Sequence, residues 1–248
     1  MTFCLGMSVQ EGLVGIADTR ITSGNEVTTA RKVRTLSVPN GQFFIMTSGL
    51  RSVRDKMLTY FEDEIEAELL DECDRLYKVV NALSSNIRRV AEEDRAALER
   101  SGLGFDIQAL VGGRLIGDKG HKLYLVYPEG NWVEIGQNSP YYIIGARGYG
   151  KPILDRTLVH TDSLLFALKV GCLAFDSTRI SASGVDFPID VVIYFSKTGE
   201  LVEHRYEYED FQEISTWWQE HLRASVHELP SEWIENVAAK LQKVNGIK

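Results

Sequence analysis

The stretch Thr2-Phe3-Cys4-Leu5-Gly6-Met7-Ser8 decides the fold, because it places a small hydroxyl residue at the head of an apolar strand. Thr2 directly follows Met1. If Met1 is removed, Thr2 carries a free α-amine and a hydroxyl on adjacent carbons, and this arrangement is a nucleophile with its own base. Such a nucleophile needs groups that tune the amine and hold an oxyanion at the same end of the strand.

The composition is that of a soluble globular protein, and it excludes several functions. The chain has 248 residues, which fits one large α/β domain or two small ones, and its net charge is -8. This charge argues against a nucleic-acid backbone as the main partner. No apolar run approaches the roughly 18 to 20 residues of a membrane helix, and we expect no secretory signal. We therefore expect a cytoplasmic protein without a nucleic-acid or membrane partner.

Cysteines, histidines and glycines give no sign of a metal or a cofactor. The three cysteines, Cys4, Cys73 and Cys172, match no zinc or disulfide framework, so we expect reduced thiols. The five histidines show no metal-ligand spacing. The glycine-rich turn at 145–150 spells G-x-x-G-x-G, which is not the dinucleotide fingerprint. We expect no metal site, no nucleotide site and no cofactor.

Hydrophobic periodicity predicts runs of strands interrupted by pairs of helices. The expected strands cover residues 2–8, 13–18, 33–38, 42–47, 105–112, 122–127, 132–135, 141–145, 186–196 and 200–206. Two long helices are expected within 50–100, and further helices at 148–160, 162–180, 210–226 and 231–244. No linker or repeat divides the chain, so we expect one domain over residues 1–248. The economical fold is a sandwich of sheets with helices on the outer faces.

Two charged residues near the first strands could serve the nucleophile. Asp18 ends the second strand, where a half-buried carboxylate needs a partner, and Lys32 lies just before the next strand. If these strands pair in one sheet, Lys32 and Asp18 can meet near Thr2, where the lysine lowers the pKa of the amine and stabilises developing charge. The alternatives are a turn aspartate that caps a loop and a surface lysine beside Arg31 and Arg34.

A glycine turn supplies the candidate oxyanion donor. Ser48-Gly49 follows an apolar strand and precedes a helix. A glycine at this position allows close backbone approach, and an N–H at a helix start is a natural donor to an oxyanion. The alternative is a simple turn from strand to helix.

The order Thr2, Asp18, Lys32 and Gly49 resembles the proteasome β-subunit family of N-terminal nucleophile hydrolases. The spacing from Thr2 to Lys32 is one residue shorter than is usual in that family, a difference that we assign to the loop at 23–30. Longer blocks narrow the resemblance to the bacterial Anbu (ancestral β-subunit) family over essentially the whole chain. These blocks are Thr-Phe-Cys-Leu-Gly at 2–6, Tyr-Gly-Lys-Pro-Ile-Leu-Asp-Arg at 149–156 and Ser-Gly-Val-Asp-Phe-Pro-Ile-Asp-Val at 183–191.

The resemblance implies an α+β fold, a four-layer αββα sandwich of two mainly antiparallel sheets flanked by helices. It also implies that Thr2 is the nucleophile, with its own α-amine as the base. Asp18 and Lys32 would tune this amine, and the Gly49 N–H would hold the oxyanion. Ser183 resembles the serine that helps to position the amine in proteasome subunits.

Two departures from the proteasome pattern indicate low or restricted peptidase activity. A second serine of the glycine turn is Ala146 here. The carboxylate that is expected three residues before Ser183 is Ile180, and Asp176 and Asp186 are nearby candidates to replace it. Activation would need only the removal of Met1, which a small second residue normally permits.

The resemblance implies a threonine-type peptidase that cleaves peptide or amide bonds within a self-assembled ring or spiral. Two alternatives stay open: an amidase or transpeptidase of the same fold with a narrow substrate, and a non-catalytic assembly scaffold. An unfoldase partner is suggested by distant relatives only. Acidic residues at 62–72 and the tryptophans Trp217, Trp218 and Trp233 are candidate assembly surfaces; the alternative is a solvated face and core.

Overall fold

The computed structural model describes residues 2–23 and 26–244. The contact pattern divides the chain into two compact units, of which the first ends at Tyr208 and the second comprises Glu209–Lys248. The first unit contains both sheets and the second contains terminal helices, and each is described by itself. The expectation of one domain over residues 1–248 therefore stays a prediction.

The first sheet carries the N-terminal strand in its interior. Its order is β10-β1-β2-β11-β12, and all neighbouring strands are antiparallel. Every residue of β1 and β2 is buried, because these strands pack against other layers on both faces. The strands are β1 (Phe3–Val9), β2 (Gly12–Asp18), β10 (Tyr141–Gly145), β11 (Ile189–Phe195) and β12 (Leu201–Tyr206).

The second sheet is also antiparallel and runs in the order β5-β6-β7-β8-β9. Pro39 and Asn40 form the tight turn between β5 and β6, and Gly41 begins β6, so the turn predicted at Pro39-Asn40-Gly41 is present. The strands are β5 (Val33–Val38), β6 (Gly41–Gly49), β7 (Ile107–Leu115), β8 (Lys122–Val126) and β9 (Trp132–Glu134).

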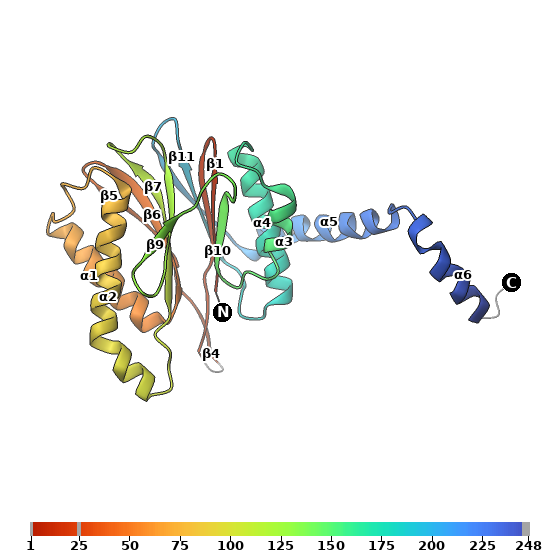
Figure 1. The fold of residues 1–248 in the computed structure, drawn as a ribbon, viewed down its shortest axis with the longest axis horizontal. Coiled ribbons are helices and arrows are strands. Elements are labelled where there is room, and N and C mark those ends of the chain that lie inside the picture. Colours follow the sequence, from red (N-terminus) through yellow and green to blue (C-terminus); the bar gives the residue numbers. More distant parts are fainter. Residues whose placement is uncertain (1, 24–25, 245–248) are drawn as a thin grey trace. The chain divides into compact units, whose positions relative to one another are not determined.

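Helices cover the outer face of each sheet, which gives the four layers αββα (Figure 1). The helices α1 (Arg51–Glu66) and α2 (Leu76–Arg100) lie over the second sheet. The helices α3 (Lys151–Thr157) and α4 (Leu164–Ser181) lie over the first. The predicted α+β class and the αββα sandwich of antiparallel sheets are therefore confirmed.

Close packing of α4 on the first sheet depends on one glycine. A Cβ on Gly171 would lie 2.5 Å from the Met7 methyl carbon and 2.7 Å from Ile16 Cδ1. A larger residue at position 171 would have to displace the ends of these two side chains, so glycine lets the helix approach β1 and β2 this closely without such a shift. The helix thereby holds the N-terminal strand against the second sheet, where Cys4, Phe44 and Met46 share one core.

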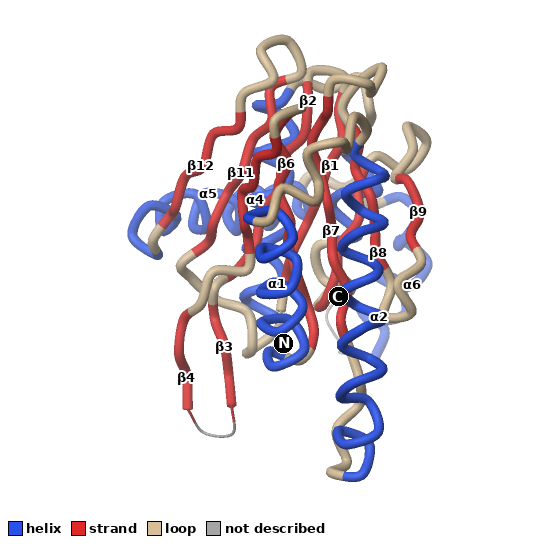
Figure 2. Tube along the Cα trace, turned by 90° about the vertical axis from the view of Figure 1, so that its left-hand side faces the viewer, coloured by secondary structure: helices blue, strands red, loops and turns tan. Residues whose placement is uncertain are grey.

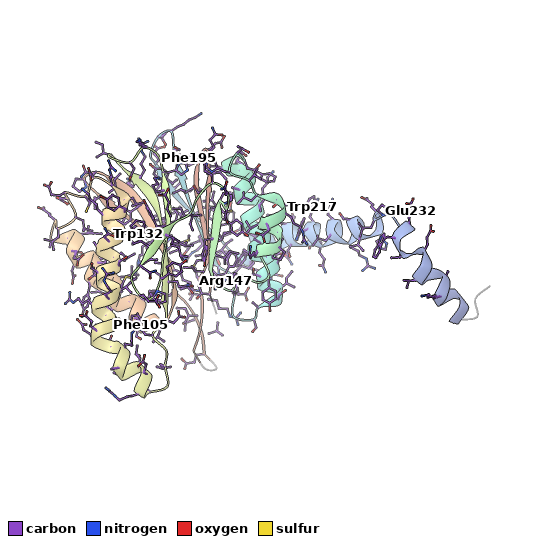
Figure 3. All side chains as sticks on the ribbon, viewed as in Figure 1. Phe105, Trp132, Arg147, Phe195, Trp217 and Glu232 are labelled. Carbon is purple, nitrogen blue, oxygen red and sulfur yellow. The ribbon has the colours of Figure 1, made fainter. Side chains whose placement is uncertain are left out.

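The edge strand β9 is fixed to α2 by an aromatic residue. Trp132, which is labelled in Figure 3, donates from its indole Nε1 to Asn81 Oδ1 at 2.8 Å. Its ring meets the Tyr124 ring edge-on at 5.1 Å between centroids. A half-buried tryptophan that packs its ring and keeps its N–H paired suits such a boundary between sheet and helix.

A two-stranded ribbon stands apart from both sheets, and the sequence did not predict it. Its strands are β3 (Arg20–Ser23) and β4 (Glu26–Thr29), which pair only with each other (Figure 2). The expectation of a loop at 23–30 was therefore wrong. Every residue of β4 is exposed, so no burial pattern marked the strand. The Ala30 N–H donates to the Thr19 carbonyl oxygen at 2.8 Å and closes the base of the ribbon.

The strands that carry Asp18 and Lys32 belong to different sheets. Asp18 ends β2 in the first sheet, whereas Lys32 immediately precedes β5 in the second. The condition that these strands pair in one sheet was therefore wrong. The two residues lie at matching ends of facing sheets, so they meet across the sandwich instead of along one sheet.

The second unit is helical. It contains most of α5 (Tyr208–His227), a short 3-10 turn at Glu232–Ile234 and α6 (Glu235–Val244). Trp217 and Trp233 are 54% and 75% exposed. Their role in assembly stays a prediction. Over residues 2–23 and 26–244, no helix has the length and apolar character that crossing a membrane requires.

Candidate active site

A pocket of about 440 Å³ opens at the end of the sandwich where β1 begins. Thr2, Lys32 and Gly49 line it. The ribbon and the first turn of α1 complete its walls. Three of the five predicted site residues therefore face one space, although they come from two sheets and from positions far apart in the chain.

A buried ion pair stands behind this pocket. Asp18 is fully buried and Lys32 is 4% exposed. Lys32 Nζ donates to Asp18 Oδ1 at 2.7 Å and to the Arg20 carbonyl oxygen at 2.8 Å. The same carboxylate oxygen accepts the Phe3 N–H at 2.7 Å, which ties the ion pair to the residue next to Thr2. The lysine is thereby held in one place at the pocket wall.

The ion pair is electrostatically costly unless both partners are present. Burial raises the pKa of the Asp18 carboxyl, and the Lys32 ammonium and the Phe3 N–H oppose this rise. Removing one partner of a buried pair leaves an uncompensated charge, which typically costs about 3–5 kcal/mol. A pair of this kind is weak support for stability by itself, and its position beside Thr2 points to a role in chemistry.

Thr2 is held through its main chain. Its carbonyl oxygen accepts the Ala146 N–H at 2.7 Å, immediately after the end of β10. Gly145 makes this contact possible, because its φ is +86° and a Cβ there would lie 2.0 Å from the Thr2 carbonyl oxygen. The side chain of Thr2 takes no part in these contacts and lines the pocket.

Gly49 also needs its lack of a side chain. Its φ is +127°, and a Cβ would lie 2.3 Å from the Asp106 carbonyl oxygen. The Leu50 N–H donates to that same oxygen at 2.8 Å, and α1 begins at the next residue. The predicted glycine turn from strand to helix is therefore present, and it borders the pocket.

Ser183 is not brought to this pocket. It is exposed in the turn after α4 and is not among the described residues that line the cavity. The Asp186 carboxylate binds Arg20 Nη1 at 2.8 Å, and Arg20 lines the pocket. Asp176 is fully buried and pairs with Arg179 at 2.8 Å. Asp186 thus supports the pocket wall indirectly.

Eight of the residues that line the pocket were missed by the sequence reasoning, and the four with the most evident chemical potential are Arg20, Thr47, Arg51 and Arg54. Arg51 and Arg54 belong to α1, where charged residues at helical spacing are most often a solvated face. Thr47 lies inside an apolar strand. Only the clustering of basic residues on both sides of Asp18 and Gly49 could have drawn attention to them.

The thiols are unsuited to act as the nucleophile. Burial raises the pKa of Cys172 to about 12 and raises the pKa of Cys4 further still. In the part of the chain that the structure describes, no three or more histidine, cysteine, aspartate or glutamate side chains are grouped as metal ligands would be.

Comparisons with known proteins find matches among solved structures. No family model and no curated protein matches the chain. A structure of an Anbu Gly-1 mutant from Hyphomicrobium sp. strain MC1 is 27% identical with a TM-score of 0.85, covering 93% of this chain and 98% of that one. Anbu from Yersinia bercovieri is 27% identical with a TM-score of 0.84 (92% and 97% covered). The helical assembly of the Anbu complex from Pseudomonas aeruginosa is 26% identical with a TM-score of 0.86 (92% and 97% covered).

The αββα sandwich, with its N-terminal strand opening onto a pocket at one end, places the chain among proteins of proteasome-like fold. The similarity extends over nearly the full length of both chains in each comparison. The chain is thus similar in fold and over nearly its full length to the Anbu (ancestral β-subunit) proteins of these structures, which supports a relation to the Anbu family.

Proposed function

We propose that this protein is an N-terminal threonine hydrolase that cleaves peptide or amide bonds, with Thr2 as the nucleophile. The observation that carries this proposal is the buried Asp18–Lys32 ion pair, 2.7 Å between charged atoms, at the pocket that Thr2 and Gly49 line. An N-terminal nucleophile needs a fixed positive charge and an oxyanion donor beside its hydroxyl, and these three elements supply both.

The proposed reaction begins once Met1, which lies outside the described residues, has been removed. The α-amine of Thr2 accepts the hydroxyl proton while Oγ1 attacks the amide carbonyl carbon. The Gly49 N–H stabilises the oxyanion. The C–N bond then breaks, and the proton passes from the α-amine to the leaving amine. Water, deprotonated by the same α-amine, hydrolyses the Thr2 ester and regenerates the hydroxyl.

Lys32 keeps the α-amine ready to act as a base. A free α-amine titrates at about 7.7–8.0 in an unperturbed environment. A fixed ammonium nearby disfavours a second positive charge, so it lowers the pKa of the amine and favours the neutral form near pH 7. Asp18 holds Lys32 in position from behind the pocket.

Self-assembly is part of the proposal. A ring or spiral of copies would sequester the pocket from folded proteins, so that unfolded peptides are the substrates. The similar Anbu complex from Pseudomonas aeruginosa forms a helical assembly, which supports this arrangement. The acidic composition and the short apolar runs support a location in the cytoplasm.

A non-catalytic assembly scaffold is the second candidate. It is favoured by the exposed position of Ser183 outside the pocket and by Ile180 at the place of the expected carboxylate. Both departures leave the α-amine with fewer partners to orient it. They are also compatible with an enzyme of low activity or narrow substrate range.

The test is the intact mass of protein purified from its native host, before and after incubation with a peptide epoxyketone that targets N-terminal threonine. We expect loss of one methionine and gain of one adduct. A screen of peptide and non-peptide amides would then separate a general peptidase from a narrow amidase. Retention of Met1 with no adduct would contradict the proposed hydrolase and favour the non-catalytic assembly scaffold.

A further inference from the structure

The pocket wall has an unusual charge balance. Four of the described residues that line it are cationic, namely Arg20, Lys32, Arg51 and Arg54, and only Glu26 is anionic. The carboxylates that pair with these cations, Asp18, Asp55 and Asp186, lie outside the lining. A substrate inside the pocket therefore meets mainly positive charge.

Two of these cations share a single partner. Arg51 Nε contacts Asp55 Oδ2 at 3.2 Å, while Arg54 donates to Asp55 Oδ1 from Nε at 2.8 Å and from Nη2 at 2.6 Å. Two guanidinium groups and one carboxylate leave one positive charge uncompensated. The Arg54 side chain is only 10% exposed, so water screens its charge poorly.

A second observation at the same wall points to a ligand that accepts hydrogen bonds. Thr47 is 2% exposed and lines the pocket, and its Oγ1 has no hydrogen-bond partner among residues 2–23 and 26–244. A buried hydroxyl is normally paired, because burial without a partner removes its hydrogen bonds to water and replaces them with nothing. Thr47 can donate to a carboxylate oxygen that enters from the pocket side.

These groups lie next to the proposed oxyanion donor in the chain. Leu50 and Arg51 follow Gly49 directly, and Arg54 lies in the first turn of the same helix. A substrate residue whose carbonyl oxygen binds at Gly49 therefore lies in the pocket that Arg51 and Arg54 also line. Arginine guanidinium groups bind carboxylates with a geometry that a neutral side chain cannot reproduce.

We propose that the pocket selects an acidic side chain, glutamate or aspartate, on the acyl side of the scissile amide, and that Arg51 and Arg54 are its specificity-determining residues. This inference rests on the proposed function, because it names the substrate class of the same site. Glu26, on the exposed ribbon strand β4, opposes the preference and limits its size.

The test uses three tripeptide epoxyketones that differ only at the residue next to the electrophile: glutamate, glutamine or lysine. The rate of adduct formation on Thr2 is followed by intact mass in the assembled, methionine-free protein at low salt. We expect the glutamate probe to react about tenfold faster than its neutral isostere, the ratio that corresponds to about 1.4 kcal/mol. The ratio should fall as salt is raised.

Substitutions distinguish a direct contact between Arg51 and the substrate carboxylate from a general electrostatic effect of the protein. Arg51 is 60% exposed on its side chain, so Arg51→Glu can fold normally, and it should abolish the preference. Arg51→Lys should keep most of it, and Glu26→Gln should increase it. Arg100→Glu, a charge reversal at the exposed far end of α2, is the matched control and should leave the ratio unchanged.

The outcomes distinguish this inference from the function on which it rests. Equal rates for the glutamate and glutamine probes, with Thr2 still modified, would overturn the acidic preference and leave the hydrolase intact. No adduct with any probe would overturn the hydrolase. The affinities of acetyl-Ala-Ala-Glu-amide and its glutamine analogue for the Thr2→Ala protein, measured by calorimetry, then test the acidic preference in a protein that cannot react. Equal affinities would refute the preference.

Discussion

The two ends of β1 open onto two pockets of similar size but different character. Thr2 lines a pocket of about 440 Å³ at one end, and Ser8 lines one of about 370 Å³ at the other. The first is backed by the Asp18–Lys32 pair, whose side chains are at most 3% exposed. The ion pair at the second, Lys122–Glu134, is 32% and 46% exposed.

The two pockets have similar volumes, so the volume of a pocket does not by itself identify a functional site. Exposed ion pairs contribute about 0–1 kcal/mol and are common on surfaces. Burial of a charged pair is costly, so it occurs where geometry holds both charges in place. The pocket at Thr2 thus combines a hydroxyl residue with a fixed cation, whereas the ion pair at the Ser8 end is exposed to solvent.

The largest difference is expected for the two hydroxyl residues. Thr2→Ala should abolish hydrolysis and adduct formation, because it removes the attacking oxygen. The assembly should remain intact, because Thr2 is held through its main-chain oxygen. Ser8→Ala should retain both activities. Turnover of peptide amides and the sedimentation profile check this pair, and full activity of the Thr2→Ala protein would refute the mechanism.

The two lysines should differ by several kcal/mol in stability. Lys32→Met leaves the buried Asp18 carboxylate unpaired and should lower the free energy of unfolding by about 3–5 kcal/mol. Adding Asp18→Asn should restore much of this loss. Lys122→Met removes an exposed pair and should cost about 0–1 kcal/mol. Urea unfolding measures both, and equal losses would mean that the buried pair has no special weight.

Two glycines give a smaller contrast. Gly49→Ala forces a side chain into a positive φ and against the Asp106 carbonyl, so we expect a loss of about 1–3 kcal/mol. Gly120 lines the pocket at the Ser8 end, and a Cβ there would meet no atom within 4 Å. Gly120→Ala should stay within about 0.5 kcal/mol of the parent. Thermal unfolding of both variants decides whether Gly49 is strained as described.

The smallest effect concerns pH at the Ser8 end. Burial lowers the pKa of His121 below its ordinary 6.5, and the charges of His160, Lys122 and Arg114 lower it further, while a hydrogen bond with Val9 opposes the shift. The unfolded chain then binds more protons below pH 6.5, so stability that is complete above pH 6.5 is lost as the pH falls towards the lowered pKa. His121→Gln should flatten the urea midpoint between pH 5.5 and 7.5. An unchanged slope would contradict this account.

Much of the fold was predictable from sequence, because short apolar runs bounded by turn residues mark most of the strands. The strands Val33–Val38 and Tyr141–Gly145 lie where the apolar runs predicted them. The assignment of strands to sheets was not predictable in the same way. Strands that are buried on both faces show no polar side, so nothing in the sequence tells which sheet they join. The contact between Asp18 and Lys32 was therefore predicted, but within one sheet, whereas the two residues come from different sheets.

The site was predictable only where residue type and position carried a chemical reason. Thr2, Lys32 and Gly49 were named from their chemistry and their family order, and they share the pocket. Arg51 and Arg54 were not, because on a helix they have the spacing of an ordinary solvated face. Ser183 was named from resemblance alone, and its role stays a prediction. The local sequence around Arg51 and Arg54 does not indicate that the start of α1 lines a pocket to which the other sheet also contributes.

The β3–β4 ribbon contributes Arg20, Ile21, Glu26 and Thr28 to a pocket whose remaining wall belongs to the sandwich. Its base is closed by a single main-chain hydrogen bond from Ala30 to Thr19. The ribbon pairs with neither sheet, so its length and side chains can change without disturbing the register of any other strand. Insertions or substitutions in the ribbon would therefore change which substrates fit the pocket. They would leave the nucleophile and its ion pair unchanged.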